Sequence, residues 1–301
     1  MHRLALTKEA RLDEQLAIQA TEPANQRWSR TIGALAGAEA WRRLCDLRLA
    51  LVGCGRTGSM LAEDLARLGV RHLVLIESDT FEEHSIAESA VLCDGDIGKP
   101  KALALTEALR RMDGSLNVYA VIGSVTSPEA LSKLRLCNAI VTAPDSDGAR
   151  LAAAMVASLY DAVLLDVGTG VRRIEGTHAI AAGADVRLIV PGDAAAACLI
   201  CHGGVRSIAG AVQEITSRAN VMPQAWHEQR AGSSRALNRQ ATGVAVALLQ
   251  DLVAERIARS TWIRIEAQSV PSMRRIEASR PRSACLCSRA GWGDAGGLGL
   301  E

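Results

Sequence analysis

Residues 47–59 read Leu-Arg-Leu-Ala-Leu-Val-Gly-Cys-Gly-Arg-Thr-Gly-Ser, an apolar run that leads into three glycines, and a helical pattern follows over residues 58–68. Glycine lets the backbone turn tightly and approach a phosphate closely, and the amino terminus of the next helix directs its free N–H groups at the anion. The stretch therefore predicts a strand, a nucleotide-binding loop and a helix, with Gly53, Gly55 and Gly58 in the loop. Glycines that serve packing alone are the alternative.

The composition indicates one large α/β core, or such a core with a small appendage. The chain has 301 residues, of which 49% are hydrophobic. Its 34 basic and 33 acidic residues leave a formal net charge of +1, which does not favour nucleic acid or an anionic membrane as a partner. Aromatic residues make up 3%, so base-stacking platforms and carbohydrate grooves are not expected.

The first residues indicate a cytoplasmic protein. Residues 1–6 run directly into a charged stretch without the apolar core of a signal peptide. No uncharged apolar stretch reaches the roughly 18 residues that a membrane helix needs. In the cytoplasm, the eight cysteines are expected to be thiols or metal ligands, not disulfides.

Strand and helix patterns alternate at short spacing over the first part of the chain. The predicted strands cover 47–52, 71–77, 117–122, 138–142 and 163–167, and the predicted helices cover 58–68, 99–112, 128–136 and 147–160. Such alternation predicts a Rossmann-like α/β fold, in which a mainly parallel sheet has helices on both faces.

The pattern changes after residue 170. Short, antiparallel strands are predicted at 172–174, 178–182 and 186–190, an irregular segment at 219–232, a long amphipathic helix at 234–259, and a hairpin at 262–267 and 273–278. We therefore expect three parts, namely a helical extension (1–45), the α/β body (46–280) and a tail rich in glycine and serine (281–301).

Charged residues follow the ends of two predicted elements. Glu77 and Asp79 end the second strand about 20 residues after the glycines, where a carboxylate can accept hydrogen bonds from ribose hydroxyls. Lys99 and Lys101 open the next helix, where a cation opposes the helix dipole unless an anion such as a triphosphate lies in front of it. An ordinary acidic loop and a solvated charged face are the alternatives.

Asp145 and Asp147 follow the fourth strand, at the carboxyl edge of the predicted sheet. Ligands gather at this edge in doubly wound folds. An aspartate there can hold Mg²⁺ while waters and phosphate oxygens complete the octahedron. The alternative is a helix N-cap, for which Asp147 is the candidate.

Two cysteine pairs predict a zinc site. Cys198 and Cys201 form the first pair, and Cys285 and Cys287 form the second. Four thiolates suit tetrahedral Zn²⁺, and four protein ligands make the zinc structural, with no open position for catalysis. Such a site would attach the tail to the body, while reduced, buried cysteines are the alternative.

Together and in this order, the motifs resemble those of the ubiquitin-activating-enzyme-like adenylyltransferases of the ThiF/MoeB/HesA type, over roughly residues 25–290. The segment 27–30, Arg-Trp-Ser-Arg, is similar to the family's Arg-Tyr-Ser-Arg. Glu-Ser-Asp at 77–79 resembles its Asp-x-Asp ribose motif, and residues 96–101 match its Asp-x-Gly-x-x-Lys. Asp145 precedes an arginine by five residues, as the family's metal-binding aspartate does, and the cysteine pairs match its zinc site.

The resemblance implies an enzyme that binds ATP and Mg²⁺ and adenylates the C-terminal glycine carboxylate of a small ubiquitin-like or sulfur-carrier protein, with release of pyrophosphate. A conjugating enzyme or a sulfur donor would be a further partner. The implied nucleotide contacts are Gly53, Gly55, Arg56, Gly58, Ser59, Glu77, Asp79 and Lys101. Lys101 would neutralise phosphate charge, Asp145 would hold the Mg²⁺, and Arg30 would reach the phosphates of a neighbouring subunit in a homodimer.

Two positions depart from the family pattern. The loop after the ribose motif carries Ser85 and Glu88 where the family has asparagine and arginine. A carboxylate near a triphosphate is unfavourable, and Arg56, where the family often has glycine, is the candidate to supply the missing charge. No cysteine occurs in residues 202–284, so no thioester is predicted there, and Cys93 is the other thiol to test.

Three hypotheses stay open. The first is the adenylating enzyme, for which adenylation of a small molecule or a tRNA base is a related option that the near-neutral charge disfavours. The second, motivated by Ser85 and Glu88, is a non-catalytic subunit that binds nucleotide or carrier. The third is an NAD-dependent oxidoreductase, which would use the glycines and the acidic residues but would leave Lys101, Asp145 and the cysteine pairs unexplained.

Overall fold

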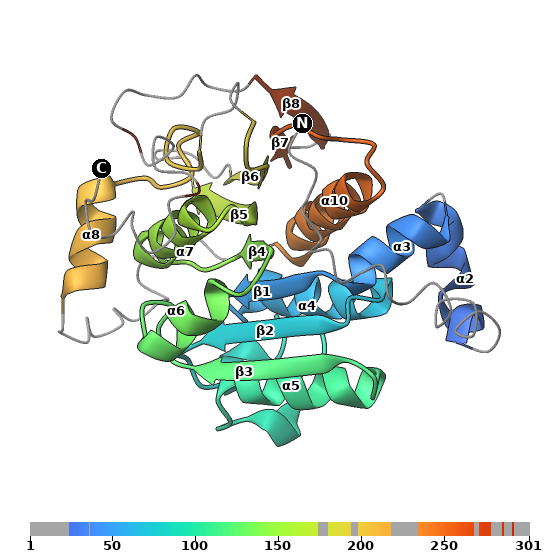
Figure 1. Ribbon diagram of the computed structural model, residues 1–301. Helices are drawn as coiled ribbons and strands as arrows, with labels where there is room; N and C mark the ends of the chain where they lie inside the picture. Colours follow the sequence, from blue (N-terminus) through green and yellow to red (C-terminus); the bar gives the residue numbers. More distant parts are fainter. Residues whose placement is uncertain are drawn as a thin grey trace.

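The computed structural model describes residues 24–35, 37–173, 180–193, 198–217, 234–267 and 271–277, together with Cys285 and Gly291. Within these residues an eight-stranded sheet runs through the molecule in the order β3-β2-β1-β4-β5-β6-β7-β8 (Figure 1). The strands are β1 (Arg48–Val52), β2 (His72–Glu77), β3 (Asn117–Ile122), β4 (Ala139–Thr142), β5 (Val163–Arg173), β6 (Ile180–Ile189), β7 (Thr261–Glu266) and β8 (Ser272–Ile276).

The strand directions divide the sheet into two parts. The pairs β1–β2, β2–β3, β1–β4 and β4–β5 are parallel, whereas β5–β6, β6–β7 and β7–β8 are antiparallel. The predicted mainly parallel sheet with antiparallel strands toward the C-terminus is thus confirmed. Because β1 lies between β2 and β4, the strand order reverses beside it, and this is where open α/β sheets form their ligand crevice.

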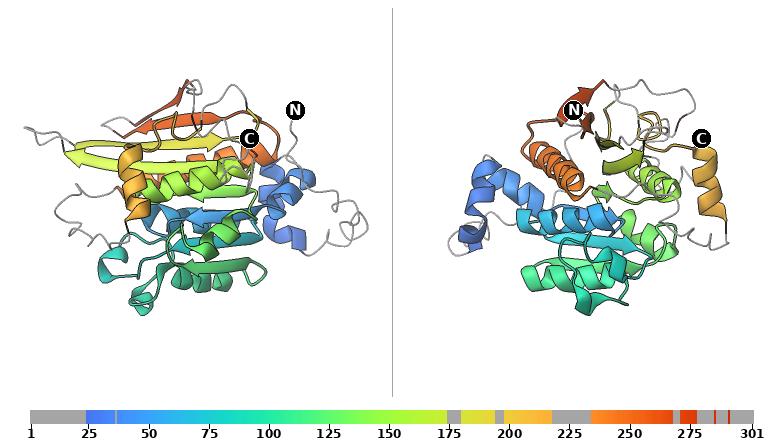
Figure 2. Two further views of the ribbon diagram at one scale, coloured as in Figure 1. Left: turned by 60° about the vertical axis from the view of Figure 1, so that its left-hand side comes forward. Right: turned by 180° about the vertical axis from the view of Figure 1, so that it is seen from behind.

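Helices cover both faces of the sheet (Figures 1 and 2). The helices α4 (Arg56–Leu68), α5 (Lys101–Met112) and α10 (Arg235–Val253) lie on one face, and α6 (Pro128–Leu134) and α7 (Asp147–Leu159) lie on the other, with α8 (Ile208–Thr216) packed on α7. Leu49 and Leu51 of β1 join the core under α4, and Ala50 and Val52 join the core under α7. The strand is therefore apolar at four successive positions because it is buried on both sides.

Two helices precede the sheet and stand at one end of it, α2 (Ala24–Ala34) and α3 (Ala38–Cys45). Trp28 of α2 is buried, and the guanidinium of Arg71 stacks on its ring at 4.3 Å from the centroid. Arg27 donates to the carbonyl of Met112 at 2.7 Å. These contacts fix α2 to the end of α5 and to the start of β2, at the amino-terminal ends of the strands.

The structure corrects several predicted boundaries. Within the described residues, the strands predicted at 178–182 and 186–190 are one strand, β6, which runs from Ile180 to Ile189 through Gly183. Glycine suits this position because its ideal Cβ position lies only 3.0 Å from the carbonyl oxygen of Ile265 on β7. Of the strand predicted at 172–174, residues 172 and 173 belong to the end of β5, and residue 174 lies outside the described residues. The helix predicted at 234–259 ends at Val253, and Glu255 then adopts a positive φ of 57°.

Helix α8 was not predicted. It has nine residues, of which Ala211 is buried, and it is therefore shorter than the stretch of about 11–18 residues over which a helical period is recognised in a sequence. The irregular segment predicted at 219–232 lies outside the described residues. Two short 3-10 turns, η2 (Glu83–Ser85) and η3 (Asp94–Asp96), occupy the predicted polar loop after β2.

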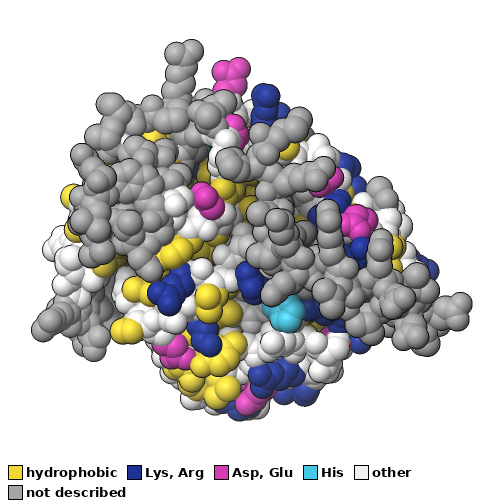
Figure 3. All heavy atoms as spheres, in the orientation of Figure 1, with side chains coloured by type: hydrophobic (Ala, Val, Ile, Leu, Met, Phe, Trp, Pro, Cys, Tyr) yellow, Lys and Arg dark blue, Asp and Glu magenta, His cyan; other side chains and the backbone are white. Residues whose placement is uncertain are grey.

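No described helix is both long enough and apolar enough to cross a membrane. On the face drawn in Figure 3, basic and acidic side chains lie interspersed, in keeping with the balanced charge of the chain.

Candidate nucleotide-binding site

The three glycines of the loop between β1 and α4 have two different structural roles. Gly53 has a φ of 93°, and its ideal Cβ position lies 2.9 Å from backbone atoms of Ala143 and Pro144, so it brings this loop against the loop after β4. A Cβ on Gly58 would lie 2.8 Å from the carbonyl carbon of Gly53 and closer still to its oxygen. A Cβ on Gly55 would meet no described atom within 4 Å. Gly53 and Gly58 therefore serve packing, and Gly55 borders open space.

The amino terminus of α4 offers free donors beside Gly55. Its N-cap is Gly55, which makes no side-chain cap. Among the hydrogen bonds of the described residues, none uses the backbone N–H of Gly55, Arg56 or Thr57. Unused N–H groups together with the positive end of the helix dipole form a favourable place for an anion.

Glu77, at the end of β2, holds the glycine loop in place. Its carboxylate accepts hydrogen bonds from the backbone N–H of Cys54 at 2.8 Å, of Ser78 at 2.8 Å and of Asp79 at 3.1 Å. Burial raises the pKa of Glu77 above its usual value, although the N–H group of Cys54 opposes this shift. The acidic residue predicted to contact ribose thus connects the glycine loop to the turn after β2.

Lys101 and Asp79 meet beside this turn. The Lys101 Nζ lies 3.0 Å from Asp79 Oδ2, and the Lys101 backbone N–H donates to the Asp79 carbonyl at 2.8 Å. The Lys101 side chain is 15% exposed and that of Asp79 is 64% exposed. Lys99 forms ion pairs instead with Asp96 and Glu107, at 3.0 and 3.1 Å. Of the two lysines predicted to face a phosphate, Lys101 is therefore the one that belongs to this cluster.

Arg56 and Ser59 connect α4 to the segment after η2. Arg56 forms an ion pair with Glu88. Ser59 is buried, and its hydroxyl donates to the carbonyl of Arg56 at 3.0 Å and accepts from the N–H of Ala90 at 3.2 Å. The Ser59 side chain therefore holds neighbouring backbone in place.

Asp145 lies in the turn between β4 and α7, exposed and directly after the Pro144 that Gly53 approaches. The prediction of Asp147 as the N-cap of α7 was wrong. Ser146 is the N-cap and accepts from the N–H of Ala149 at 3.2 Å. The carboxylate of Asp147 instead accepts from the backbone N–H of Arg206 at 3.1 Å. Asp147 therefore serves to connect α7 to the segment before α8.

A buried ion network fixes the base of this turn, and sequence reasoning missed it. Asp166 of β5 is fully buried and accepts from Thr142 Oγ1 at 2.8 Å, from Arg150 Nη1 and from Arg187 Nη1 at 3.1 Å. Arg150 also donates to the carbonyl of Pro144 at 2.9 Å. The available signal was an aspartate inside the apolar strand Val-Leu-Leu-Asp-Val, because a buried charge requires partners.

The network continues across the sheet through Asp185 of β6. This carboxylate accepts from Arg187 at 3.1 Å, from Arg264 Nε at 2.9 Å and from the Trp262 indole at 2.7 Å. Burial alone would raise the pKa of Asp185, but its hydrogen bond with Arg264 and the charge of Arg187 hold the pKa below its usual value. The antiparallel strands are thus joined to the parallel ones by charge-assisted hydrogen bonds.

Three of the four predicted zinc ligands come together. The Cys285 Sγ lies 3.4 Å from that of Cys198 and 3.2 Å from that of Cys201, and all three sulfur atoms lie within 4.8 Å of one another. Zn–S bonds of about 2.3 Å in a tetrahedron place sulfur atoms roughly 3.8 Å apart, so the three thiols match the size of such a site. Cys287 lies outside the described residues.

Cys93, the other thiol considered, is exposed, and its sulfur lies 3.6 Å from Asp96 Oδ2. Asp96 is buried. Burial acts to raise its pKa, but the hydrogen bond from Lys99 lowers that pKa below its usual value. The described contact of the Cys93 thiol is thus with a carboxylate and not with a histidine, lysine or arginine that would activate it as a nucleophile.

Arg30 lies far from the glycine loop of its own chain. It is an exposed residue of α2, and α2 is fixed at the carboxyl end of α4, where the ideal Cβ position of Gly69 lies 3.1 Å from the Trp28 indole nitrogen. The glycine loop is at the other end of α4. A helix of 13 residues is about 20 Å long, so Arg30 could serve a nucleotide site only in a neighbouring subunit.

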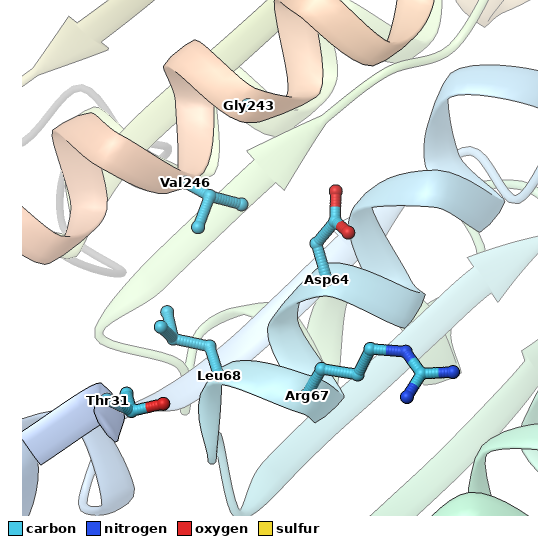
Figure 4. A pocket seen from close by; sticks show the side chains of 6 residues that line it. All are labelled: Thr31, Asp64, Arg67, Leu68, Gly243 and Val246. Carbon is cyan, nitrogen blue, oxygen red and sulfur yellow. The ribbon is translucent and has the colours of Figure 1, made fainter. Parts of the chain in front are cut away.

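A hollow of about 340 Å³ lies elsewhere, between α2, α4 and α10 (Figure 4). In the figure, Leu68 and Val246 point into it from α4 and α10. It contains none of the predicted site residues. A smaller cavity of about 40 Å³ adjoins the glycine loop and is lined by Arg56, Thr169, Gly170, Val171, Ser234, Leu237 and Asn238. The candidate site is assigned to the glycine loop because the charged groups and free donors gather there.

The sequence profile of the ThiF family matches residues 28–259, which include the whole of the site described above. The chain belongs to the ThiF family.

Curated relatives of this ThiF-family chain match part of it. It is 30% identical to the SAMP-activating enzyme E1 of Haloferax volcanii over 110 residues, which cover 36% of this chain and 41% of that protein. It is 28% identical to the sulfur carrier protein ThiS adenylyltransferase of Bacillus subtilis over 117 residues, or 38% of this chain and 35% of that one. The matched part thus spans about two fifths or less of the length of these relatives.

Solved structures share the fold over a longer stretch. The crystal structure of E. coli MccB with ATP aligns with a TM-score of 0.64 at 16% identity and covers 87% of this chain and 74% of that one. A second MccB structure, with succinimide, has a TM-score of 0.66 at 15% identity. At this identity the likeness establishes the fold of the ThiF-family chain and nothing finer.

Proposed function

We propose that this chain is an ATP-dependent adenylyltransferase that activates the C-terminal glycine carboxylate of a small ubiquitin-like or sulfur-carrier protein. The observation that carries the proposal is that the glycine loop before the uncapped α4 terminus is held against two turns, one with Asp79 and its partner Lys101 and the other with the exposed Asp145. The printed names of the relatives, an activating enzyme and a sulfur-carrier adenylyltransferase, support the same reaction class. The MccB structure with ATP supports the choice of nucleotide.

In the proposed reaction, a carboxylate oxygen of the carrier attacks the α-phosphorus, the new O–P bond forms, and the bond to pyrophosphate breaks. Two negatively charged groups must approach each other, so catalysis depends on positioning and on cations around the phosphates. The α4 N–H groups and Lys101 would supply that stabilisation. Asp79, the more exposed partner of Lys101, would bind the ribose together with Glu77, and Lys101 would then be released toward phosphate.

Magnesium is part of the proposal. Asp145 would hold the ion, because an exposed carboxylate next to the glycine loop is a suitable oxygen ligand. When bound, Mg²⁺ neutralises charge on phosphate oxygens and orients them.

We further propose that Cys198, Cys201, Cys285 and Cys287 bind a structural Zn²⁺. The three described sulfur atoms gather closely enough to share one ion. The N–H of Gly291 donates to the Ser158 carbonyl at the end of α7, at 2.9 Å. This second contact between the tail and the body supports a metal-fastened tail, residues 281–301, attached to the α/β body, residues 46–280.

We also propose a homodimer, which the position of Arg30 supports. If this residue contacts phosphate at all, it does so from a second copy, because its own site lies at the far end of α4. Sedimentation of the purified protein tests the dimer. Mixing an Arg30→Ala chain with a Lys101→Ala chain then tests sharing, because a mixed dimer keeps one intact site and should recover part of the activity that both parents lack.

ATP–pyrophosphate exchange in the presence of a carrier protein ending in Gly-Gly tests the main proposal. We expect exchange with the wild-type chain, a loss of at least tenfold in Lys101→Ala, and a much smaller effect in the matched control Lys99→Ala, whose ammonium is paired with Asp96 and Glu107. Equal rates in the wild type and Lys101→Ala would contradict the proposal.

One observation favours a second candidate, a subunit that binds nucleotide or carrier without turnover. The only described ion-pair partner of Arg56 is the carboxylate of Glu88, so the pair adds no net positive charge for the phosphates. Tight carrier binding without AMP formation would support this candidate, and robust turnover by the isolated chain would remove it.

A further inference from the structure

We infer that Arg56 is a second phosphate-binding cation of this chain beside Lys101, and that Glu88 occupies it as an internal substitute for phosphate, so that the two side chains form a latch which nucleotide must open. The inference rests on the proposed nucleotide site and deepens it. By this inference Arg56 raises the affinity for nucleotide, whereas Glu88, with which it forms an ion pair, lowers it.

Arg56 is placed where a bound phosphate would lie. It is the first residue of α4, directly after Gly55, and its own backbone N–H is among the free donors of the helix terminus. Arg56 is one of the residues that line the cavity of about 40 Å³. The Arg56 Nε is buried and has no hydrogen-bond partner among the described residues. The pair with Glu88 therefore leaves the hydrogen bonding of the guanidinium incomplete, which favours a change of partner.

Hydrogen bonds hold the backbone that carries Glu88 in place beside Arg56. Its N–H donates to the Ser85 carbonyl at 3.1 Å. From α10, Arg235 Nη1 donates to the carbonyls of Ala87, Glu88 and Ser89 at 3.2 to 3.3 Å. The next residue, Ala90, donates to Ser59 of α4. Because the segment is hydrogen-bonded to both α4 and α10, the pair opens by movement of the Arg56 and Glu88 side chains and not of the backbone.

The chemistry of the pair explains why it acts as a latch. A carboxylate and a phosphate offer the same kind of oxygen acceptors to a guanidinium, and either can bind it through two parallel hydrogen bonds. The side chains of Arg56 and Glu88 are 25% and 31% exposed, so water reaches the pair and can exchange its partners. While Glu88 holds Arg56, the glycine loop presents no net charge from this pair, and nucleotide binds only to the open fraction.

A binding experiment on four proteins tests the latch, with titration of Mg·ATP into the full chain. If the pair is closed about nine-tenths of the time, the apparent Kd is roughly tenfold above that of the open form. Glu88→Gln should therefore bind Mg·ATP about tenfold more tightly than the wild type, and Arg56→Gln should bind it at least tenfold more weakly. In Arg56→Gln/Glu88→Gln, the gain from Glu88→Gln should largely disappear, because Glu88 acts through Arg56.

Two further variants serve as controls for this experiment. Glu83→Gln removes the same charge from the exposed turn before Glu88 and should leave the Kd within about twofold. Arg56→Lys keeps the cation and should recover part of the affinity that Arg56→Gln loses, with its thermal midpoint measured to confirm folding.

The outcomes separate the latch from the proposed function. If the wild type binds Mg·ATP but Glu88→Gln binds it equally or more weakly, the pair is a structural fastening and the latch is overturned while the nucleotide site stands. If Glu88→Gln tightens binding equally with and without Arg56, Glu88 acts by direct repulsion and the latch is again overturned. If none of the folded variants binds Mg·ATP, the proposed function itself falls.

Discussion

Replacing Gly58 with alanine should damage the fold, whereas replacing Gly55 should damage only ligand binding. A methyl group on Gly58 would lie 2.8 Å from the carbonyl carbon of Gly53, where carbon atoms prefer about 3.5 to 4.0 Å. The first turn of α4 and the end of β1 would therefore have to separate by at least about 0.7 Å. Both belong to backbone in the middle of the core, so neither can move without disturbing neighbours.

The expected cost follows from this overlap. Overpacking of a core typically costs about 1–3 kcal/mol, and the better helix propensity of alanine offsets up to about 1 kcal/mol. Because the methyl group would meet fixed backbone atoms, the cost of overpacking lies toward the upper end of that range. The net destabilisation of Gly58→Ala is then about 2 kcal/mol, which lowers the thermal midpoint of a chain of this size by roughly 4–8 °C. Nucleotide binding should weaken as well, because the loop is displaced.

Gly55→Ala is the matched variant. Its φ of −72° is accessible to alanine, and no described atom lies within 4 Å of the added methyl group. The thermal midpoint should therefore stay within about 2 °C of the wild type. The methyl group would occupy the space next to the free N–H groups, so the Kd for Mg·ATP should rise at least tenfold.

Differential scanning fluorimetry and isothermal titration calorimetry on the three proteins measure both effects. Unchanged Mg·ATP affinity in a folded Gly55→Ala chain would mean that phosphate does not approach this loop. A Gly58→Ala chain as stable as the wild type would mean that α4 and β1 are not packed as closely as the structure has them.

Three further predictions concern the buried charges and the thiols. Asp166→Ala should lower the free energy of unfolding by about 3–5 kcal/mol in urea titrations, because Arg150 and Arg187 lose a shared, fully buried partner. The control Glu266→Ala removes a half-buried carboxylate that pairs with Arg274, and it should cost less than about 1 kcal/mol. Asp185→Asn should destabilise the chain most near pH 7 and least below about pH 4. The reason is that a carboxylate whose pKa is lowered in the folded state contributes stability that is lost as it becomes protonated. If the difference in unfolding free energy between wild type and variant did not change with pH, the lowered pKa of Asp185 would be contradicted. Cys201→Ser should abolish stoichiometric zinc in elemental analysis and lower the thermal midpoint, and chelator should lower the midpoint of the wild type but not that of the variant.

Local sequence was sufficient for the parallel half of the fold. The five strands that it predicts occur, because each is a short apolar run whose neighbours are amphipathic helices or glycine turns. It failed where the signal was weak or spread across several elements. Helix α8 buries a single residue, and β6 contains a glycine that interrupts its apolar pattern.

The candidate site likewise contains residues whose positions the sequence could predict and contacts that it could not. The positions of Gly55, Lys101 and Asp145 could be predicted because each follows directly from a strand end or a helix start. The packing role of Gly58 could not, because it depends on the distance to Gly53 across a turn. The pairing of Arg56 with Glu88 could not either, since these residues lie 32 positions apart on segments that α10 and Ser59 hold together.

By itself, then, the sequence determined the order of strands and helices in the parallel half of the sheet, the glycine loop at the first crossover and the family, because these depend on short stretches whose periodicity and spacing are local properties. Only the tertiary structure decided which charges neutralise one another. Asp166 with its arginines, Asp79 with Lys101 and Glu88 with Arg56 are pairs formed between distant segments. The energy of a charge depends on its partner and its burial, and both exist only once the sheet has brought those segments together.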